Sequence, residues 1–469
     1  MWRRLIDQLK GQGARHEPLE SRDLNPGAGA GTVGGNTTMT LEGSTTMGGA
    51  VPPGFIARRP LIGRKGAIAG LEFRLDDAAM WRILSEGDHA EATFTRALFV
   101  SMRSATEHKR YAYAALPLRS IMLECTLELA APGMMICVLP DESDASSDAS
   151  GRADLKFLAE RLSELRARGV AIGWPASWLA ALPVRPVADF ISLQYISGAI
   201  DGLLESGKQW ARAMPGSLLI ATDIASINDL EQAVRGGIAL SSGTFSRVVV
   251  EEERTRNRKI APQHMRLCKI LNDLVLDVDV THLAEQMKSD VVLSYRLLRY
   301  ANSAAMALSR HIDSVPQALL LLGRNELYRW VSVMLVHSAN GHVLSGSLQE
   351  VSLARARLLE LLAIARAIDP PEGLFTVGMF SLLDAMLQIP MQEALEPLRL
   401  PPAARMALAE ESGPWRPYVD LMLALEVGEP ASIARHASAL QLPVPVVLMH
   451  AEEASRWAAQ TVILPGDDR

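Results

Sequence analysis

The chain has 469 residues, about three times the length of a typical domain, so two or three domains are expected and one compact core is excluded. Apolar residues make up 48% of the chain and charged residues 21%, which excludes disorder throughout. The formal net charge of -6 at pH 7 argues against a protein that coats nucleic acid through its overall charge. We therefore expect partners that bind at specific sites, and no nucleic acid.

The first 54 residues predict a flexible leader. Residues 27–54 consist mainly of Gly, Thr and Ser, and no apolar period runs through them. Residues 1–12 contain charged side chains where a signal peptide needs its apolar run, and no stretch is long and apolar enough for a membrane-spanning helix. Cys125, Cys137 and Cys268 have no CxxC spacing, which favours a reducing compartment. We therefore expect a cytoplasmic protein without stable membrane insertion.

Short apolar runs alternate with helix-compatible stretches between residues 55 and 253. Several of these runs are continuous rather than alternating, which is typical of strands covered on both faces of a parallel sheet. Residues 153–168 predict a helix between two runs, with Gly169 as its C-cap. The order predicts a (β/α)8 barrel, in which functional residues lie at the carboxyl ends of the strands. The eight runs are residues 67–73, 97–102, 120–124, 134–139, 170–173, 190–193, 217–221 and 237–240.

Helical periods dominate residues 254–469, where strand signals nearly disappear. Asp290 is placed to cap a helix whose apolar face includes Val291 and Leu298. Ser314 and Gln317 have the spacing of a capping box, and Gly323 is expected to end the helical run that follows them. The sequence therefore predicts a compact all-α domain.

Two stretches of this helical region resemble a known family. Residues 297–331 (LLRYANSAAMALSRHIDSVPQALLLLGRNELYRWV) resemble the signature of the HDOD domain, a helical output module of bacterial signalling proteins. Residues 374–387 (LFTVGMFSLLDAML) resemble a segment that follows the HDOD core in proteins where an EAL barrel precedes it. EAL domains are named for their cyclic-di-GMP phosphodiesterase motif. The resemblance implies an HDOD domain with a C-terminal helical extension over residues 254–469.

The preceding region fits that arrangement. Residues 57–75 (ARRPLIGRKGAIAGLEFRL) resemble the first strand of EAL proteins, with Glu72 and Arg74 where the naming Glu and a following Arg would lie. The resemblance implies that residues 55–253 form a degenerate EAL-like (β/α)8 barrel. The predicted fold class is thus α/β plus all-α.

Several positions depart from the pattern of an active EAL phosphodiesterase. Such enzymes hold divalent cations with carboxylates at the strand ends, and the cations activate water and stabilise the transition state. None of the ten histidines is followed by Asp, so the His-Asp pair that binds metal in the HD superfamily, which the HDOD fold resembles, is also missing. We therefore expect no catalytic residue, no metal site, no cofactor and no enzymatic activity. At the positions of the carboxylates, the resemblance places Cys137, Pro140, Gly173, Trp174, Gln194, Ala221 and Ile224, and Ser242 stands where the family has a glutamine.

Glu72, Arg74 and Asp223 are the polar residues that remain at the strand ends. Glu72 and Arg74 are the two candidate nucleotide contacts, although a Glu and an Arg at a strand end also form structural ion pairs.

The sequence therefore predicts a non-catalytic bacterial signal-transduction regulator. The inactive EAL-like domain would act as scaffold or input, and the HDOD domain would contact other signalling proteins. A cyclic-di-GMP receptor that binds without hydrolysis is the first alternative, and a residual phosphodiesterase is favoured least. We also expect a homodimer, by analogy with other EAL-like barrels.

Overall fold

The computed structural model describes residues 56–75, 88–140, 151–182, 184–196, 198–245, 260–302, 311–338, 343–369 and 371–462. The chain divides into two compact units, and each is described by itself. Unit 1 comprises Met1–Ser246 and Ala424–Ala434, and unit 2 comprises Arg247–Leu423 and Arg435–Arg469. The predicted leader lies outside the described residues. So does the predicted domain boundary at residues 253 and 254, which stays a prediction.

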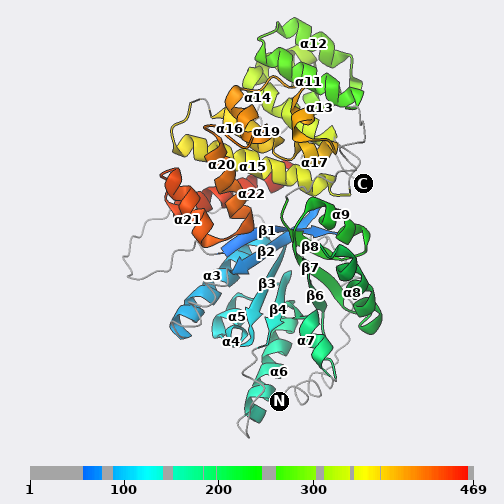
Figure 1. Ribbon diagram of the computed structural model, residues 1–469, viewed down its shortest axis with the longest axis vertical. Helices are drawn as coiled ribbons and strands as arrows, with labels where there is room; N and C mark the ends of the chain where they lie inside the picture. The colour runs from blue at the N-terminus through cyan, green and yellow to red at the C-terminus, as the bar shows by residue number, and fades with distance from the viewer. Residues whose placement is uncertain are drawn as a thin grey trace. The chain divides into compact units, whose positions relative to one another are not determined.

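Unit 1 is built on a closed barrel of eight strands in sequential order (Figure 1). The first strand is antiparallel to both of its neighbours, β2 and β8, and the remaining pairs are parallel. The strands are β1 (Ile56–Gly63), β2 (Ile68–Leu75), β3 (Tyr111–Pro117), β4 (Met134–Leu139), β5 (Ala171–Pro175), β6 (Phe190–Gln194), β7 (Leu218–Ile224) and β8 (Leu240–Gly243).

Helices occupy the connections between these strands and lie outside the barrel (Figure 1). They are α3 (Asp88–Glu107), α4 (Leu118–Ile121), α5 (Glu124–Leu129), α6 (Gly151–Ala167), α7 (Ala176–Ala181), α8 (Ile200–Ala213) and α9 (Ile227–Arg235). The helix predicted for residues 153–168 corresponds to α6.

Side chains from β1, β3, β4, β6, β7 and β8, together with Ala239 just before β8, fill the inside of the barrel. Tyr113 and Phe190 meet edge to face, with ring centroids 5.8 Å apart. Gly173 lies against Phe190 so closely that an added Cβ would come within 2.3 Å of its ring, so only glycine fits there. The buried cluster comprises Leu61, Tyr113, Met135, Cys137, Phe190, Leu218, Ile220, Ala239 and Leu240.

Two of the predicted strands are wrong. Residues 97–102 lie within α3, and residues 120–124 extend from α4 into the start of α5. Leu98, Phe99 and Met102 are fully buried, and their spacing of one and four residues marks one face of a helix. A short apolar run does not by itself distinguish a strand from such a face. β1 and β3 were missed, and residues 237–240 meet β8 only at Leu240.

Unit 2 is helical, as predicted. Asp290 caps α13 by accepting a hydrogen bond from the amide of Leu293 at 3.0 Å, which confirms the predicted helix start. Gly323 interrupts α14 with φ 70° and ψ 172°. The helices are α11 (Pro262–Val275), α12 (Val280–Lys288), α13 (Val291–Ala301), α14 (Val315–Ser338), α15 (Ser345–Ala365), α16 (Glu372–Phe380), α17 (Leu383–Leu387), α18 (Met391–Leu395), α19 (Pro402–Ala409), α20 (Arg416–Val427), α21 (Pro430–Ala439) and α22 (Val444–Val462). The end of α20 and the start of α21, within Ala424–Ala434, belong to unit 1.

A buried carboxylate ties three of these helices together. Glu360 on α15 is 3% exposed and pairs with Arg329 on α14 and with Arg357 one turn earlier on its own helix. Arg357 reaches Glu453 on α22 at 2.9 Å. A buried charge without its partners is strongly destabilising, so this network fixes how α14, α15 and α22 pack.

Candidate functional site

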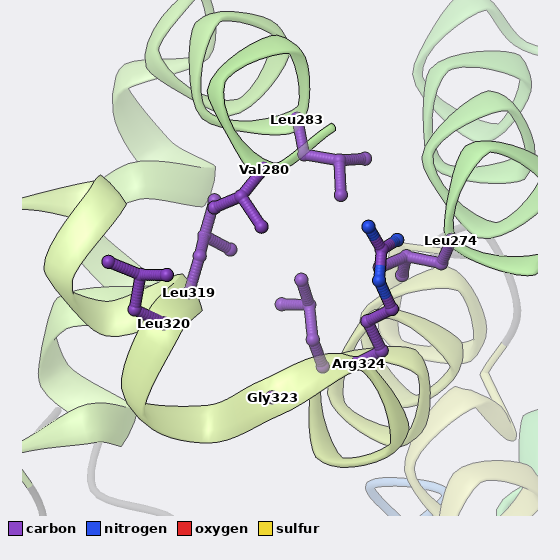
Figure 2. A pocket seen from close by; sticks show the side chains of 8 residues that line it. Leu274, Val280, Leu283, Leu319, Leu320, Gly323 and Arg324 are labelled. Atoms are coloured by element: carbon purple, nitrogen blue, oxygen red, sulfur yellow. The ribbon is translucent and has the colours of Figure 1, made fainter. Parts of the chain in front are cut away.

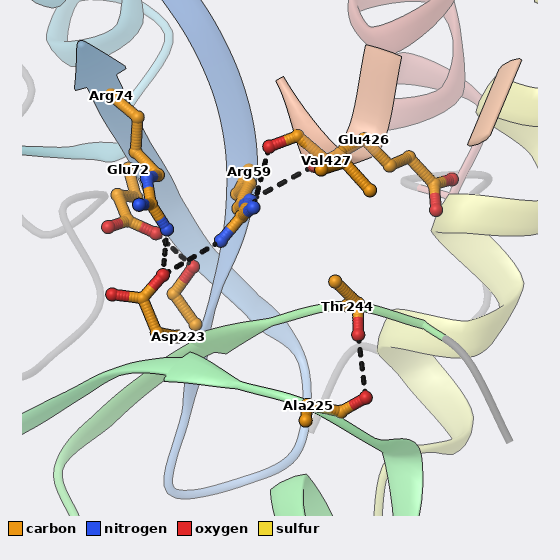
Figure 3. A network of polar contacts seen from close by, with 9 residues as sticks. Arg59, Glu72, Arg74, Asp223, Ala225, Thr244, Glu426 and Val427 are labelled. Atoms are coloured by element: carbon orange, nitrogen blue, oxygen red, sulfur yellow. Dashed lines mark hydrogen bonds and ion pairs between the residues drawn. The ribbon is translucent and has the colours of Figure 1, made fainter. Parts of the chain in front are cut away.

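A cluster of charged side chains lies at the rim where the carboxyl ends of the parallel strands meet. Asp223, near the end of β7, accepts hydrogen bonds through Oδ1 from Arg59 on β1, at 3.2 Å, and from Arg74 on β2 (Figure 3). One carboxylate therefore bridges two guanidinium groups. The side chain of Arg74 is 32% exposed and that of Asp223 is 38% exposed, so a ligand at the rim can reach both.

The backbone of β7 is distorted where it presents Asp223. The pairing of β7 with β8 is irregular between Ala221 and Ile224, and Asp223 has a positive φ of 64°. Aspartate adopts this left-handed conformation more readily than most residues because its short polar side chain can bond locally. Bulges of this kind re-aim side chains and are frequent next to functional sites.

Glu72 lies below the rim and is closed to solvent. It is 4% exposed, and its Oε2 accepts a hydrogen bond of 2.5 Å from the hydroxyl of Ser242 on β8. Of the two nucleotide contacts predicted from the sequence, Arg74 is therefore accessible and Glu72 is not. The ion-pair partner of Arg74 is Asp223, a residue noted in the sequence only as a polar remnant.

Arg59 was missed in the sequence although it is central to the cluster. Its Nε donates to the carbonyl of Glu426 at 3.0 Å and its Nη2 to the carbonyl of Val427 at 2.6 Å (Figure 3). These carbonyls end α20, where helices leave backbone acceptors unpaired. Burial lowers the pKa of the Arg59 guanidinium, and the positive charge of Arg74 lowers it further. The sequence offered one signal for Arg59, which is that a charged residue stands inside the otherwise largely apolar stretch 56–63.

Most of the positions that were predicted to lack metal ligands carry residues that are buried or hydrogen-bonded to neighbours. Trp174 is fully buried and stacks on Trp178, with ring centroids 4.7 Å apart. Burial raises the pKa of the Cys137 thiol to about 12, so it stays protonated at neutral pH. Within the described residues, no group of three or more His, Cys, Asp or Glu side chains is arranged to hold a metal ion.

Comparison with known proteins finds a family that matches part of the helical region and a relative that aligns with nearly the whole chain. Residues 261–396 match the HDOD domain family. The chain is 25% identical over 417 residues to the cyclic di-GMP phosphodiesterase CdgJ of Vibrio cholerae, covering 86% of this chain and 92% of that protein. It is 28% identical over 214 residues to the uncharacterized protein YuxH of Bacillus subtilis, covering 45% of this chain and 52%, or about half, of YuxH.

Solved structures of EAL domains resemble the chain more distantly. An EAL domain protein from Listeria monocytogenes matches with a TM-score of 0.31 and 12% identity, covering 40% of this chain and 85% of that one. The FimX EAL domain from Pseudomonas aeruginosa, solved with bound c-di-GMP, matches with a TM-score of 0.29 and 15% identity, covering 40% and 87%.

The predicted architecture is confirmed: a closed barrel of eight strands precedes a helical region that contains an HDOD domain. Among the described helices, none combines the length and apolar character that crossing a bilayer requires.

The prediction that the chain is not an enzyme is wrong. It is contradicted by the relative named a cyclic di-GMP phosphodiesterase, whose similarity extends over 86% of this chain. The prediction took a few strand-end positions as the complete set of metal ligands. Asp76, Asp77 and Asp141 follow β2 and β4 in the sequence and lie outside the described residues.

Proposed function

We propose that this protein takes part in cyclic-di-GMP signalling in the bacterial cytoplasm, with the dinucleotide bound at the barrel mouth and the HDOD domain in contact with other signalling proteins. The observation that carries the proposal is the accessible guanidinium of Arg74 at the carboxyl ends of the strands. Arginine pairs with phosphate through two parallel charge-assisted hydrogen bonds, which are stronger than bonds between neutral groups.

The two guanidinium groups at the rim can pair with an anionic ligand. Arg59 and Arg74 carry two positive charges and share Asp223 as a carboxylate, while Glu72 lies buried beneath them with its bond to Ser242. Cyclic di-GMP has two phosphodiester groups, each with a negative charge. One of these can displace the partly exposed carboxylate of Asp223 from Arg74 without uncovering a buried charge, because Asp223 keeps its bond to Arg59.

A second candidate function is hydrolysis of cyclic di-GMP. The similarity to the protein named a phosphodiesterase supports it. The described residues alone do not fit a divalent-cation site, because Glu72 is bonded to Ser242 and Asp223 to two arginines. We therefore derive no hydrolytic step from them.

Calorimetric titration of the full-length protein with cyclic di-GMP tests the binding. The proposal expects a dissociation constant below roughly 100 µM and weaker binding of GMP, which has one guanine and one phosphate. Absence of measurable binding up to that concentration would remove the proposal. Incubation of the same sample with Mg²⁺ or Mn²⁺, followed by chromatography of the nucleotides, tests the second candidate through the appearance of the linear dinucleotide.

A further inference from the structure

Three helices of unit 2 surround an apolar pocket that the proposed function does not use. The pocket has a volume of about 210 Å³ and lies between α11, α12 and α14 (Figure 2). Leu274, Leu283 and Leu319 contribute buried side chains to its wall. Leu320 lies at its edge with 71% of its surface exposed. An exposed leucine beside an apolar hollow is a common feature of surfaces that bind a partner.

Gly323, where α14 is interrupted, lines the pocket. Gly323 has a positive φ of 70°, and the helix is kinked there. An added Cβ at Gly323 would meet no atom within 4 Å, so the space beside it is unfilled. Glycine is suited to this position because side chains disfavour the left-handed conformation.

Arg324 brings one polar group to this apolar wall. Figure 2 shows its guanidinium extending between Leu274 and Leu283. Nη2 donates to the carbonyl of Val278 at 2.6 Å, and Nε pairs with Asp277 at 2.7 Å. The third nitrogen, Nη1, is buried and has no hydrogen-bond partner among the described residues. Leaving such a donor unpaired is costly, and a buried donor without an acceptor calls for an explanation.

We propose that this pocket binds a peptide segment of a partner protein, which inserts one leucine-like side chain and offers a neutral backbone carbonyl to Arg324. This inference rests on the proposed role of the HDOD domain in contacting other proteins. The volume is below the roughly 300 Å³ at which small-molecule sites begin, and it suits an apolar side chain better than a metabolite.

The charges around Arg324 decide between a neutral and an acidic acceptor. Asp277 is 83% exposed beside the guanidinium, and Asp279 is exposed two residues further on. Both carboxylates repel a third one, so an acidic side chain is disfavoured next to the pocket. A backbone carbonyl accepts from Nη1 without this repulsion.

The test uses the full-length chain with ¹³C-labelled leucine methyl groups, followed by NMR. The probe is N-acetyl-leucine methylamide, which carries the apolar side chain and neutral carbonyls. It is compared with N-acetyl-glycine methylamide, which lacks the side chain, and with N-acetyl-leucine, which is negatively charged. We expect the first probe to shift the methyl signals of Leu274, Leu283 and Leu320, the glycine probe to shift none of them, and the acid to bind at least threefold more weakly.

Arg324→Met keeps an unbranched apolar stem but removes the donor. We expect it to weaken binding of the leucine methylamide about tenfold. The matched control is Arg266→Met on α11, which removes an arginine that is 49% exposed and absent from the pocket lining. This control should bind the probe like the parent protein.

The inference is overturned if the leucine and glycine probes behave alike, or if the shifted methyl groups lie elsewhere. The first outcome requires no substitution, so misfolding of a variant cannot hide it. Titration of the same samples with cyclic di-GMP separates this result from the proposed function. Loss of one kind of binding with retention of the other identifies which of the two ideas has failed.

Discussion

Arg59→Met removes the guanidinium that connects the barrel rim to residues 424–434 of the same compact unit. The side chain of Arg59 is 7% exposed and makes three hydrogen bonds: to Asp223, to the carbonyl of Glu426 and to the carbonyl of Val427. Methionine fills a similar volume and makes none of them. Asp223 keeps its bond to Arg74 and its exposure to water, so the main loss falls on the two carbonyls at the end of α20.

The free-energy cost of Arg59→Met follows from the loss of the hydrogen bonds to these two carbonyls. A hydrogen bond to a charged donor contributes about 1.5 to 3 kcal/mol. The replacement also relieves the desolvation of the buried guanidinium, so we take the lower end for each bond and expect about 3 kcal/mol in total. Because each 1.4 kcal/mol changes an equilibrium constant tenfold, local opening of residues 424–434 should become about 100-fold more frequent.

Hydrogen exchange followed by mass spectrometry measures this opening in the full-length protein. We expect faster amide exchange in residues 424–434 of Arg59→Met and unchanged exchange in β4 and β5. The matched control is Arg96→Met, which removes an arginine that is 59% exposed in an ion pair with Glu128. Equal exchange in Arg59→Met and the parent protein would show that these hydrogen bonds do not hold residues 424–434 in place, and faster exchange throughout the barrel would indicate general destabilisation instead.

Three further predictions concern other charged or buried groups. Glu360→Gln, which weakens the pairing of a carboxylate that is 3% exposed, should lower the free energy of unfolding of the helical unit by about 3 kcal/mol in urea, whereas Glu452→Gln at an exposed pair should change it by less than about 0.5 kcal/mol. Since burial raises the pKa of the Cys137 thiol to about 12, its thiolate is scarce at pH 8, and a disulfide reagent followed by absorbance should modify it only after unfolding; rapid modification of the native protein would contradict this. Asp223→Asn keeps a residue that tolerates positive φ and releases Arg74, so calorimetry should show about threefold tighter binding of cyclic di-GMP, and weaker binding would contradict the charge argument.

Continuous apolar runs predicted most of the barrel strands because both faces of those strands are covered. The same rule failed for residues 97–102, which form the buried face of α3. It missed β3 as well, where small alanines alternate with tyrosines in YAYAALP and give a weak apolar signal. Local capping chemistry was more dependable, since Asp290 and Gly323 act within a few residues of their own positions.

The site was only partly predictable, because local sequence patterns do not show contacts between residues that are far apart in the chain. Arg74 follows the motif that carries the resemblance, so its position near a strand end could be read from the sequence. The bonds of Arg59 join residues separated by 164, 367 and 368 positions, and no local pattern signals such partners. The prediction of no activity rested on a comparison of single strand-end positions, and the similarity to the relative named a phosphodiesterase contradicts it.

The most direct test of the account is a paired calorimetric titration of Arg74→Gln and Arg96→Gln with cyclic di-GMP. Both variants remove one positive charge from the same compact unit, but only Arg74 lies at the barrel mouth. We predict that Arg74→Gln binds cyclic di-GMP at least about tenfold more weakly than the parent protein, while Arg96→Gln binds it equally well. Equal affinity of the two variants would contradict the claim that the rim of the barrel is the nucleotide site.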